Sequence, residues 1–176
     1  MNIIVATSSN WGIGYKNELL FRISPDLKRF KQLTMGKTIV MGHNTFKSLP
    51  NMQPLPGRKN IVMSRNPSLK IPGAYVAGSK EQVMEMGANS EVFIIGGEQI
   101  YELFLDDCKR IYLTSVMSCP KADSFFPNLD KKPEWQLESK SELQRANGFE
   151  FFYCTYFNSP TASSTLSTSD SSTIAL

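Results

Sequence analysis

The feature that most constrains the fold is the alternation of short apolar segments with short amphipathic ones between residues 2 and 116. The apolar segments predict strands at residues 2–7, 37–41, 59–64, 74–76, 92–95 and 110–116. The segments between them predict helices at residues 24–34, 44–49, 79–87 and 98–105. Strands that alternate with helices usually pair in parallel, because each helix carries the chain back across a face of the sheet.

The pattern changes toward the C-terminus. Residues 134–139 and 149–157 predict two further strands, and Asn147-Gly148 near their connection is a strong hairpin signal. We therefore expect an α/β fold: a mixed, mostly parallel central sheet with an antiparallel C-terminal hairpin at its edge and helices on both faces. Ser and Thr dominate residues 158–176, which predicts a disordered tail after a folded domain of residues 1–157.

The helix at residues 24–34 has recognisable ends. Ser24 is expected to be the N-cap, with its hydroxyl accepting a backbone N–H, and Pro25 suits the first helical position. Gly36, just beyond the end, is a plausible terminator. The basic residues Lys28, Arg29 and Lys31 are expected to point mostly away from the apolar face.

Asp26 is the anomaly of this helix. It shares the apolar face of Phe30 and Leu33, with Leu27 at the edge of that face. One interpretation is that Asp26 only favours the positive end of the helix dipole. The other is a carboxyl group in an apolar pocket beside a ligand, where desolvation raises its pKa while the dipole and any hydrogen bond lower it. Such a group can hold or relay a proton near neutral pH.

Composition excludes several classes of protein. A chain of 176 residues supports one domain with a real core, and a net charge of +3 suits an anionic small ligand but is too weak to predict nucleic-acid binding. No apolar run approaches the length that spans a bilayer, and residues 3–6 are too short for a secretory signal, so we expect a cytoplasmic protein.

The side chains that usually carry catalysis are scarce. The three cysteines form no CxxC pair, and His43 is the single histidine, so neither a zinc site nor a nucleophilic triad is expected. Buried or idle thiols are the simpler interpretation of the cysteines. Any difficult chemistry would therefore depend on a cofactor.

Phosphate-binding signals follow three of the predicted strands. Gly96-Gly97 and Gly42 each stand between a strand and a helix, where glycine lets a ligand approach the backbone and the helix offers unpaired N–H groups. Ser64-Arg65 adds a hydroxyl and a guanidinium suited to a phosphate monoester. Singly, the glycines could just form turns and Arg65 could be a surface charge. Because ligands of α/β sheets collect at the carboxyl ends of strands, where the loop at residues 8–17 also begins, the set indicates a phosphorylated dinucleotide.

Together these motifs resemble the dihydrofolate reductase family, in its compact, single-domain bacterial form, over residues 3–157. The matching segments are Gly12-Ile13-Gly14, Pro25-Asp26-Leu27-Lys28-Arg29-Phe30-Lys31, Gly36-Lys37, Met41-Gly42, Asn44-Thr45-Phe46, Leu55-Pro56-Gly57-Arg58-Lys59-Asn60-Ile61-Val62, Ile95-Gly96-Gly97 and Phe126-Pro127. The resemblance implies NADPH-dependent reduction of dihydrofolate to tetrahydrofolate. It also implies a cis peptide between Gly96 and Gly97.

The resemblance implies a role for each site residue. Asp26 would be the catalytic residue, binding the 2-amino group and N3 of the pteridine and promoting protonation at N5 while NADPH delivers hydride to C6. Thr114 would orient Asp26, and Arg58 would bind the α-carboxylate of the glutamate. The remaining walls of the substrate site would be Ile4, Ala6, Leu27, Phe30, Leu49 and Ile95. The NADPH site would be lined by Ala6, Ile13, Gly14, Gly42, His43, Thr45, Ser64, Arg65, Gly96, Gly97 and Tyr101.

Two positions depart from the family's pattern. Leu20-Phe21 stands where Pro-Trp is usual, so the indole N–H is missing and the rigidity of the loop before the helix could differ. His43 replaces a common arginine after Gly42, and a histidine carries only part of a positive charge near pH 7. We expect weaker or more pH-sensitive NADPH binding in consequence, unless His43 is an idle surface residue.

Two rival functions stay open at this point. A pyrimidine reductase of riboflavin synthesis shares the scaffold but lacks the acidic helix and the Leu-Pro-Gly-Arg segment that are present here around Asp26 and Arg58. A non-catalytic protein that binds folate or NADPH is the other rival, and the Leu20-Phe21 change makes it conceivable. We expect a monomer with dihydrofolate as its small-molecule partner.

Overall fold

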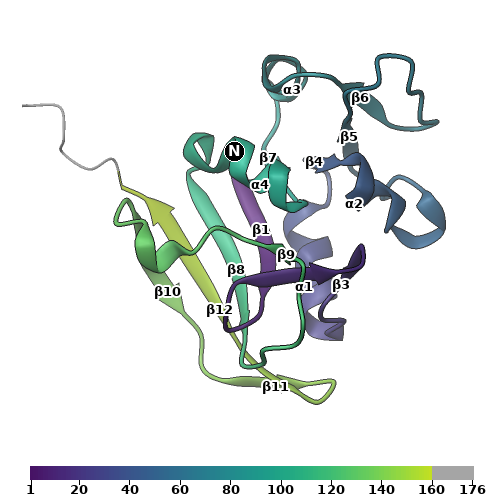
Figure 1. Cartoon of the computed structure of the whole chain (residues 1–176). Coiled ribbons are helices and arrows are strands. Elements are labelled where there is room, and N and C mark those ends of the chain that lie inside the picture. Colours follow the sequence, from purple (N-terminus) through teal and green to yellow (C-terminus); the bar gives the residue numbers. More distant parts are fainter. Residues whose placement is uncertain (160–176) are drawn as a thin grey trace, which may run out of the picture.

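The computed structural model of the chain describes residues 1–159, and one large sheet organises it (Figure 1). The nine strands of this sheet include a continuous path in the order β10-β12-β8-β1-β7-β4-β5-β6, and β11 pairs with β12. Their bounds are β1 Asn2–Thr7, β4 Thr38–Gly42, β5 Lys59–Met63, β6 Tyr75–Ala77, β7 Val92–Ile94, β8 Arg110–Val116, β10 Trp135–Lys140, β11 Gln144–Ala146 and β12 Phe149–Asn158.

The directions of the strands confirm the predicted architecture. From β8 to β6 every neighbouring pair is parallel. β12 runs antiparallel to β8, and β10 and β11 run antiparallel to β12, so the C-terminal strands form an antiparallel edge. In this arrangement the carboxyl ends of the parallel strands meet at one edge of the sheet, where a ligand is expected to bind.

Helices cover both faces of the sheet, as predicted. They are α1 Ser24–Thr34, α2 His43–Lys47, α3 Lys80–Gly87 and α4 Glu98–Phe104. On β1, Ile4 points to the face where Phe30 of α1 and Phe46 of α2 pack. Ile3 and Val5 point to the opposite face, against Val83 of α3 and Phe104 of α4. The period of two along β1 thus divides the core into two layers.

The loop after β1 is more ordered than its composition suggests. Residues 8–17 were expected to be irregular, but β2 (Gly12–Tyr15) and β3 (Glu18–Leu19) form a hairpin to which β9 (Ser124–Phe125) adds a third strand. Figure 1 shows this small sheet across β1, and β1 and β2 are in contact. β2 was not predicted because its glycines lower strand propensity. The backbone of β2 nevertheless makes its hydrogen bonds with β3 and β9.

The start of α1 corrects one expectation. Ser24 is the first helical residue rather than the N-cap, Ile23 occupies the cap position, and no side chain of the helix caps its end. The N–H of Ser24 instead donates to Oδ1 of Asn147 at 2.9 Å. Asn147, which is distant in sequence, therefore binds the first N–H of the helix, and helix propensity alone does not reveal this contact.

Asn147-Gly148 forms the predicted hairpin turn, but between different strands. It joins β11 to β12, with φ of 52° at Asn147 and 79° at Gly148, as the tight turn requires. The short strand β11 was missed because it has three residues and mixed polarity. The predicted disordered tail of residues 158–176 falls, beyond Ser159, outside the described residues.

Among residues 1–159, no helix is long and apolar enough to cross a membrane. Within the same range, no three acidic, histidine or cysteine side chains gather closely enough to hold a metal ion.

Candidate active site

Asp26 projects from the first turn of α1 toward the carboxyl half of β8. Its Oδ1 accepts a hydrogen bond of 2.5 Å from the Thr114 hydroxyl. Thr114 is itself buried, and it pairs in register with Ala6 of β1. Within residues 1–159 the second oxygen, Oδ2, has no hydrogen-bond partner, so this oxygen is free to accept from a ligand.

Burial controls the protonation of Asp26. Desolvation raises the pKa of its carboxyl group above the ordinary value, while the Thr114 hydrogen bond and the charge of Arg29 act in the opposite direction and lower it. The net pKa is raised, so the side chain is closer to accepting a proton near neutral pH than an exposed aspartate. This is the property expected of an acid–base group in a pocket.

Arg29 does not point away from the site, contrary to the expectation for the basic residues of α1. Its guanidinium stacks on the Tyr153 ring, with Cζ 4.4 Å from the ring centroid. Lys28 and Lys31 are exposed, as expected. Sequence reasoning missed Arg29 because arginine on a helix usually reaches solvent, whereas here an aromatic residue from the C-terminal strand covers it.

An apolar wall continues from Asp26 along one face of the sheet. Ile4, Phe30, Leu49 and Ile95 belong to one packed cluster, so four of the predicted substrate residues come together. Ala6 lies two residues beyond Ile4 on the same face of β1. Leu27 is 49% exposed and no contact places it against this cluster.

Arg58 stands at the far end of α1 from Asp26. Its Nη1 donates to the Thr34 hydroxyl at 3.2 Å, its Nε donates to the Pro56 carbonyl at 3.0 Å, and its guanidinium lies 6.0 Å from the Phe30 ring centroid. The guanidinium is therefore fixed at the edge of the apolar wall, in an orientation that can present donors to a carboxylate.

Asn60 fixes the loop that carries Arg58, and sequence reasoning assigned it no role. Its side chain accepts from the Leu55 N–H and donates to the carbonyls of Leu55 and Arg58, each at 2.9 Å. The residue is 2% exposed. A buried amide inside an apolar strand was the available signal, because such a group needs partners.

Five of the predicted cofactor residues come together at the ends of β4 and β7: Gly42, Thr45, Gly96, Gly97 and Tyr101. The Gly42 N–H donates to the Gly96 carbonyl at 2.8 Å. A Cβ on Gly97 would lie 3.4 Å from the Thr45 hydroxyl, and one on Gly96 would lie 3.1 Å from the Tyr101 ring. Gly42 and Gly97 precede α2 and α4, and neither helix has a side-chain cap. The peptide bond between Gly96 and Gly97 is cis.

These features fit the pyrophosphate of a dinucleotide. Two glycines leave a space that side chains would fill, and uncapped backbone N–H groups lack acceptors that phosphate oxygens supply. Ser64 and Arg65 follow β5, which is the neighbour of β4 in the sheet, and Arg65 is exposed. We call Gly96 and Gly97, together with the uncapped starts of α2 and α4, the glycine cradle. The hydroxyl of Ser64 and the guanidinium of Arg65 are donors that match the chemistry of a further phosphate beside this cradle.

The other predicted cofactor residues differ in how closely they approach this cradle. The Tyr101 ring packs against Gly96, and its hydroxyl already donates to the Ile4 carbonyl at 2.9 Å. Tyr101 therefore supports the backbone at Gly96. Burial raises the pKa of Tyr101 far above its ordinary value, and the phenol stays neutral. Ile13 packs in the core on the α4 side, and Gly14 lies in the hairpin of the small sheet.

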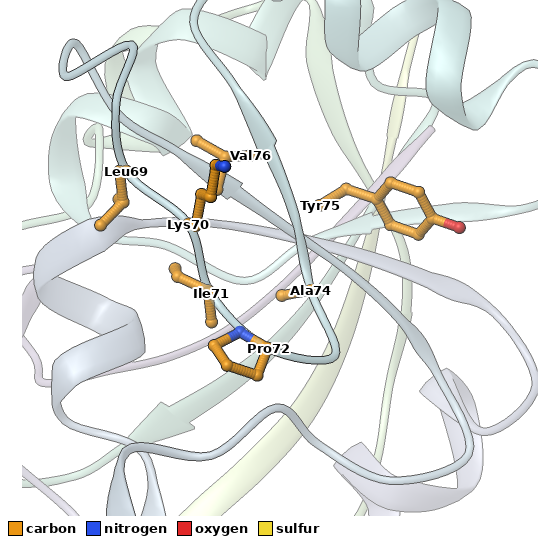
Figure 2. A pocket seen from close by; sticks show the side chains of 7 residues that line it. All are labelled: Leu69, Lys70, Ile71, Pro72, Ala74, Tyr75 and Val76. Atoms are coloured by element: carbon orange, nitrogen blue, oxygen red, sulfur yellow. The ribbon is translucent and has the colours of Figure 1, made fainter.

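Two surface hollows lie apart from Asp26. One, of about 480 Å³, is lined by Leu69, Lys70, Ile71, Pro72, Ala74, Tyr75 and Val76. Figure 2 shows that these side chains come from one loop and β6, with the Tyr75 ring directed away from the loop residues. The other, of about 340 Å³, reaches His43 and Lys47 of α2. Neither is lined by a carboxylate or a predicted substrate residue.

The chain is similar to known proteins over most of its length. The family model described as dihydrofolate reductase matches residues 1–158. A dihydrofolate reductase of Buchnera aphidicola is 35% identical over 156 residues, which cover 87% of this chain and 96% of that protein. One from Mycobacterium leprae is 44% identical over 118 residues, or 66% of this chain and 72% of that protein.

A solved structure gives the same result. The dihydrofolate reductase from Enterococcus faecalis, complexed with NADP(H) and RAB-propyl, superposes with a TM-score of 0.80 at 28% identity, covering 89% of this chain and 95% of that one. The family model spans residues 1–158, from β1 to the end of β12, so its match includes both the acidic helix and the glycine cradle. The chain therefore belongs to the dihydrofolate reductase family.

Proposed function

We propose that Asp26 is the residue through which this NADPH-dependent dihydrofolate reductase promotes protonation of its substrate at N5. The observation that carries the proposal is a desolvated carboxyl group whose Oδ1 is held by Thr114 and whose Oδ2 is left for a ligand. A pteridine presents adjacent N–H donors, at N3 and the 2-amino group, that a carboxylate can accept together.

The reaction adds two hydrogens across one double bond. Dihydrofolate gains a hydride at C6 and a proton at N5, which saturates the C6–N5 bond and gives tetrahydrofolate. NADPH, when bound, supplies the hydride. Asp26 binds the pteridine and favours its protonated form, and Thr114 holds the carboxylate in place. Ile4, Phe30 and Ile95 exclude water beside it, which strengthens these polar interactions.

The two ligands would occupy opposite ends of the site. Arg58 would bind the glutamate α-carboxylate, with Leu27 and Leu49 beside the benzoyl group and Ala6 between the two ligands. Gly42, Thr45, Gly96 and Gly97 would hold the pyrophosphate, while Ser64 and Arg65 would bind the further phosphate. Ile13, Gly14, His43 and Tyr101 complete the proposed cofactor site. The geometry of the uncapped helices beside the glycines supports this arrangement.

A spectrophotometric assay tests the proposal. Purified protein with NADPH and dihydrofolate should show falling NADPH absorbance, and Asp26→Asn should reduce kcat/KM by about 10²-fold or more, the usual contribution of a positioned acid–base group. Asp106→Asn, at an exposed carboxylate of the same chain, is the matched control and should leave the rate unchanged. Full turnover in Asp26→Asn would overturn the role given to Asp26. Binding of both ligands without turnover would instead indicate a carrier.

His43 gives a separate test of the cofactor site. Because an imidazole can donate a hydrogen bond to a phosphate oxygen, we expect His43→Ala to weaken NADPH binding. Titration of the protein with NADPH by fluorescence measures the affinity. An affinity unchanged in His43→Ala would make His43 a bystander.

The unit that performs this reaction is proposed to be residues 1–157, working as a monomer in the cytoplasm. Nine of the described strands form one sheet, and the family model ends at residue 158. Both observations support a single catalytic domain. Sedimentation velocity of the purified protein measures the assembly state, and a dimer at micromolar concentration would contradict the monomer.

A further inference from the structure

Arg29 carries the one positive charge that faces Asp26 within residues 1–159, yet it forms no ion pair there. The two residues are three apart on α1, which places their side chains on neighbouring parts of the helix surface. The guanidinium stacks on Tyr153 at 4.4 Å and lies 5.9 Å from the Tyr112 ring centroid. A direct pair with Asp26 would occupy the oxygen that the substrate needs.

The sheet explains why Arg29 is held at this position. Tyr153 of β12 pairs in register with Thr114 of β8, so the two side chains stand together on one face of the sheet. Tyr112, two residues before Thr114, stands on the same face. Thr114 binds Asp26, and Tyr153 binds Arg29. Two adjacent strands thereby fix the separation of the carboxylate and the guanidinium.

The surroundings of Arg29 also strengthen the effect of its charge on Asp26. Its Nη1 is buried and has no hydrogen-bond partner among the described residues. An arginine stays protonated even when burial lowers the pKa of its side chain, as it does here. A charge withdrawn from water is screened less than a surface charge and acts more strongly on a neighbour.

We propose that Arg29 is a positioning residue for Asp26: stacked on Tyr153, its charge favours the ionised carboxylate from a distance and leaves Oδ2 free for the pteridine. This inference rests on the proposed role of Asp26. The other titratable groups facing the pair are the phenols of Tyr101, Tyr112 and Tyr153 and the thiol of Cys154. Burial raises the pKa of Tyr101, Tyr153 and Cys154, and these groups stay neutral over the working pH range.

Carbon-13 NMR of aspartate carboxyl groups in the full-length, ligand-free protein tests the proposal, with the Asp26 signal assigned by its loss in Asp26→Asn. Arg29→Met removes the charge and keeps an unbranched side chain, so the pKa of Asp26 should rise by about one pH unit or more, as expected for loss of a nearby opposite charge. Arg29→Lys keeps the charge and should restore the pKa to within about 0.3 of the unmodified protein.

Lys28→Met is the matched control, since Lys28 is the adjacent basic residue of α1 and is exposed. It should leave the pKa of Asp26 within about 0.3 of the original, because a solvated charge is screened. An equal rise in Lys28→Met, or a rise below about 0.3 in Arg29→Met, would overturn the proposal. Arg29→Gln replaces the Met variant if that one does not fold.

A second pair of variants tests the stacking. Tyr153→Phe keeps the ring and should leave the pKa of Asp26 in place, whereas Tyr153→Leu frees the guanidinium and should move that pKa by about half a unit or more. Equal values in the two variants would contradict the role of the ring. The NMR titration needs no turnover, so it decides the role of Arg29 separately from the activity of Asp26→Asn, which decides the proposed function.

Discussion

Asp26 lies where burial raises the pKa of its carboxyl group, and this has a consequence for stability. In the unfolded chain an aspartate titrates near pH ~3.9. Because the folded pKa is higher, the folded state keeps its proton over a range of pH in which the unfolded state has lost it. The contribution of Asp26 to folding stability therefore falls as the pH rises from about 4 through the folded pKa, and stays low above it.

We expect Asp26→Asn to raise the free energy of unfolding of the ligand-free protein at pH 7, with the gain shrinking toward pH 4. Urea denaturation at several pH values measures the difference. Asp106→Asn, at an exposed site, should show no comparable gain. If Asp26→Asn were less stable than the native protein at pH 7 and equally stable at pH 4, the change in stability would have the opposite sign. That result would contradict a cost of burying the ionised Asp26 carboxylate.

Asn60 supports a second prediction for a single side chain. Asn60→Ala leaves the Leu55 N–H and the carbonyls of Leu55 and Arg58 without their partner. We expect a loss of about 2–4 kcal/mol in stability, because three partly buried hydrogen bonds are lost and each contributes roughly 0.5–1.5 kcal/mol. The KM for dihydrofolate should rise more than kcat falls, since Arg58 loses its fixed position.

Urea denaturation and steady-state kinetics measure the two effects of Asn60→Ala. Asn66→Ala is a suitable control, because Asn66 is exposed and lies in a turn beyond β5. It should change stability by about 0.5 kcal/mol or less. If the two variants have the same KM, the loop does not position Arg58.

Single residues also show what the sequence could and could not predict. Asp26 was identifiable because a carboxylate on an apolar helical face needs an explanation. Asn60 and Arg29 were not assigned, because their partners come from a loop and from β12, and helical or strand periodicity describes only the element's own surface. Local pattern finds an unusual residue, but only tertiary contact shows what it binds.

Among the elements, the segment that enters α1 is anchored to the C-terminal hairpin. Phe21 is 7% exposed and meets Phe149 edge to face at 5.2 Å, in a cluster with Ile23, Val116 and Phe151. The hydrogen bond from the Ser24 N–H to Asn147 joins the same two elements. The position where the family usually has Trp is therefore a packing site here, and Phe fills it.

Phe21→Ala should cost about 3–5 kcal/mol, as for other buried aromatic truncations. Because the cavity opens between the hairpin and the segment leading to Asp26, kcat/KM should fall as well. Phe21→Leu, which refills part of the volume, should recover most of the stability. Thermal or urea unfolding and the NADPH assay measure these effects. A loss below about 1 kcal/mol in Phe21→Ala would show that the cluster contributes little to the fold.

Element boundaries show where prediction from sequence stops. β1 and β8 were predicted at their observed bounds, and α1 differs only at its start, where Ser24 is helical and Ile23 is the N-cap; each of the three has a sustained apolar period. β2, β3 and β9 were not predicted, because they are short and their pairing is set by segments that are distant in sequence. The composition of the loop could indicate function at the site, but not the hairpin that builds it.

For the whole molecule, the alternation of elements and the terminal hairpin were enough to predict a mostly parallel sheet with an antiparallel edge. The order of the strands was not predicted, because β1 lies in the middle of the sheet, between β8 and β7. This central position of β1 places Ile4 and Ala6 beside both Thr114 and the glycine cradle. The active site therefore depends on the order of the strands rather than on any one motif.

The described structure also indicates where the catalytic unit can end. β12 finishes at Asn158, and the Ser159 N–H donates to the Glu134 carbonyl at 2.8 Å, which joins the end of β12 to the start of β10. We expect a chain ending at Ser159 to keep kcat and KM within about twofold, and its Tm within about 2 °C, because the hydrogen bonds that close the sheet remain.

A chain ending at Gly148 is the matched comparison. It lacks β12, which pairs with β8 from Arg110 to Val116 and carries the Tyr153 ring that holds Arg29. Without this strand β8 becomes an unpaired edge and the face beneath α1 loses Phe151, so we expect no cooperative unfolding transition and no turnover. Circular dichroism and the NADPH assay compare the two chains. If the chain ending at Ser159 also lost activity, residues beyond it would belong to the catalytic unit, and the boundary at residue 157 would be wrong.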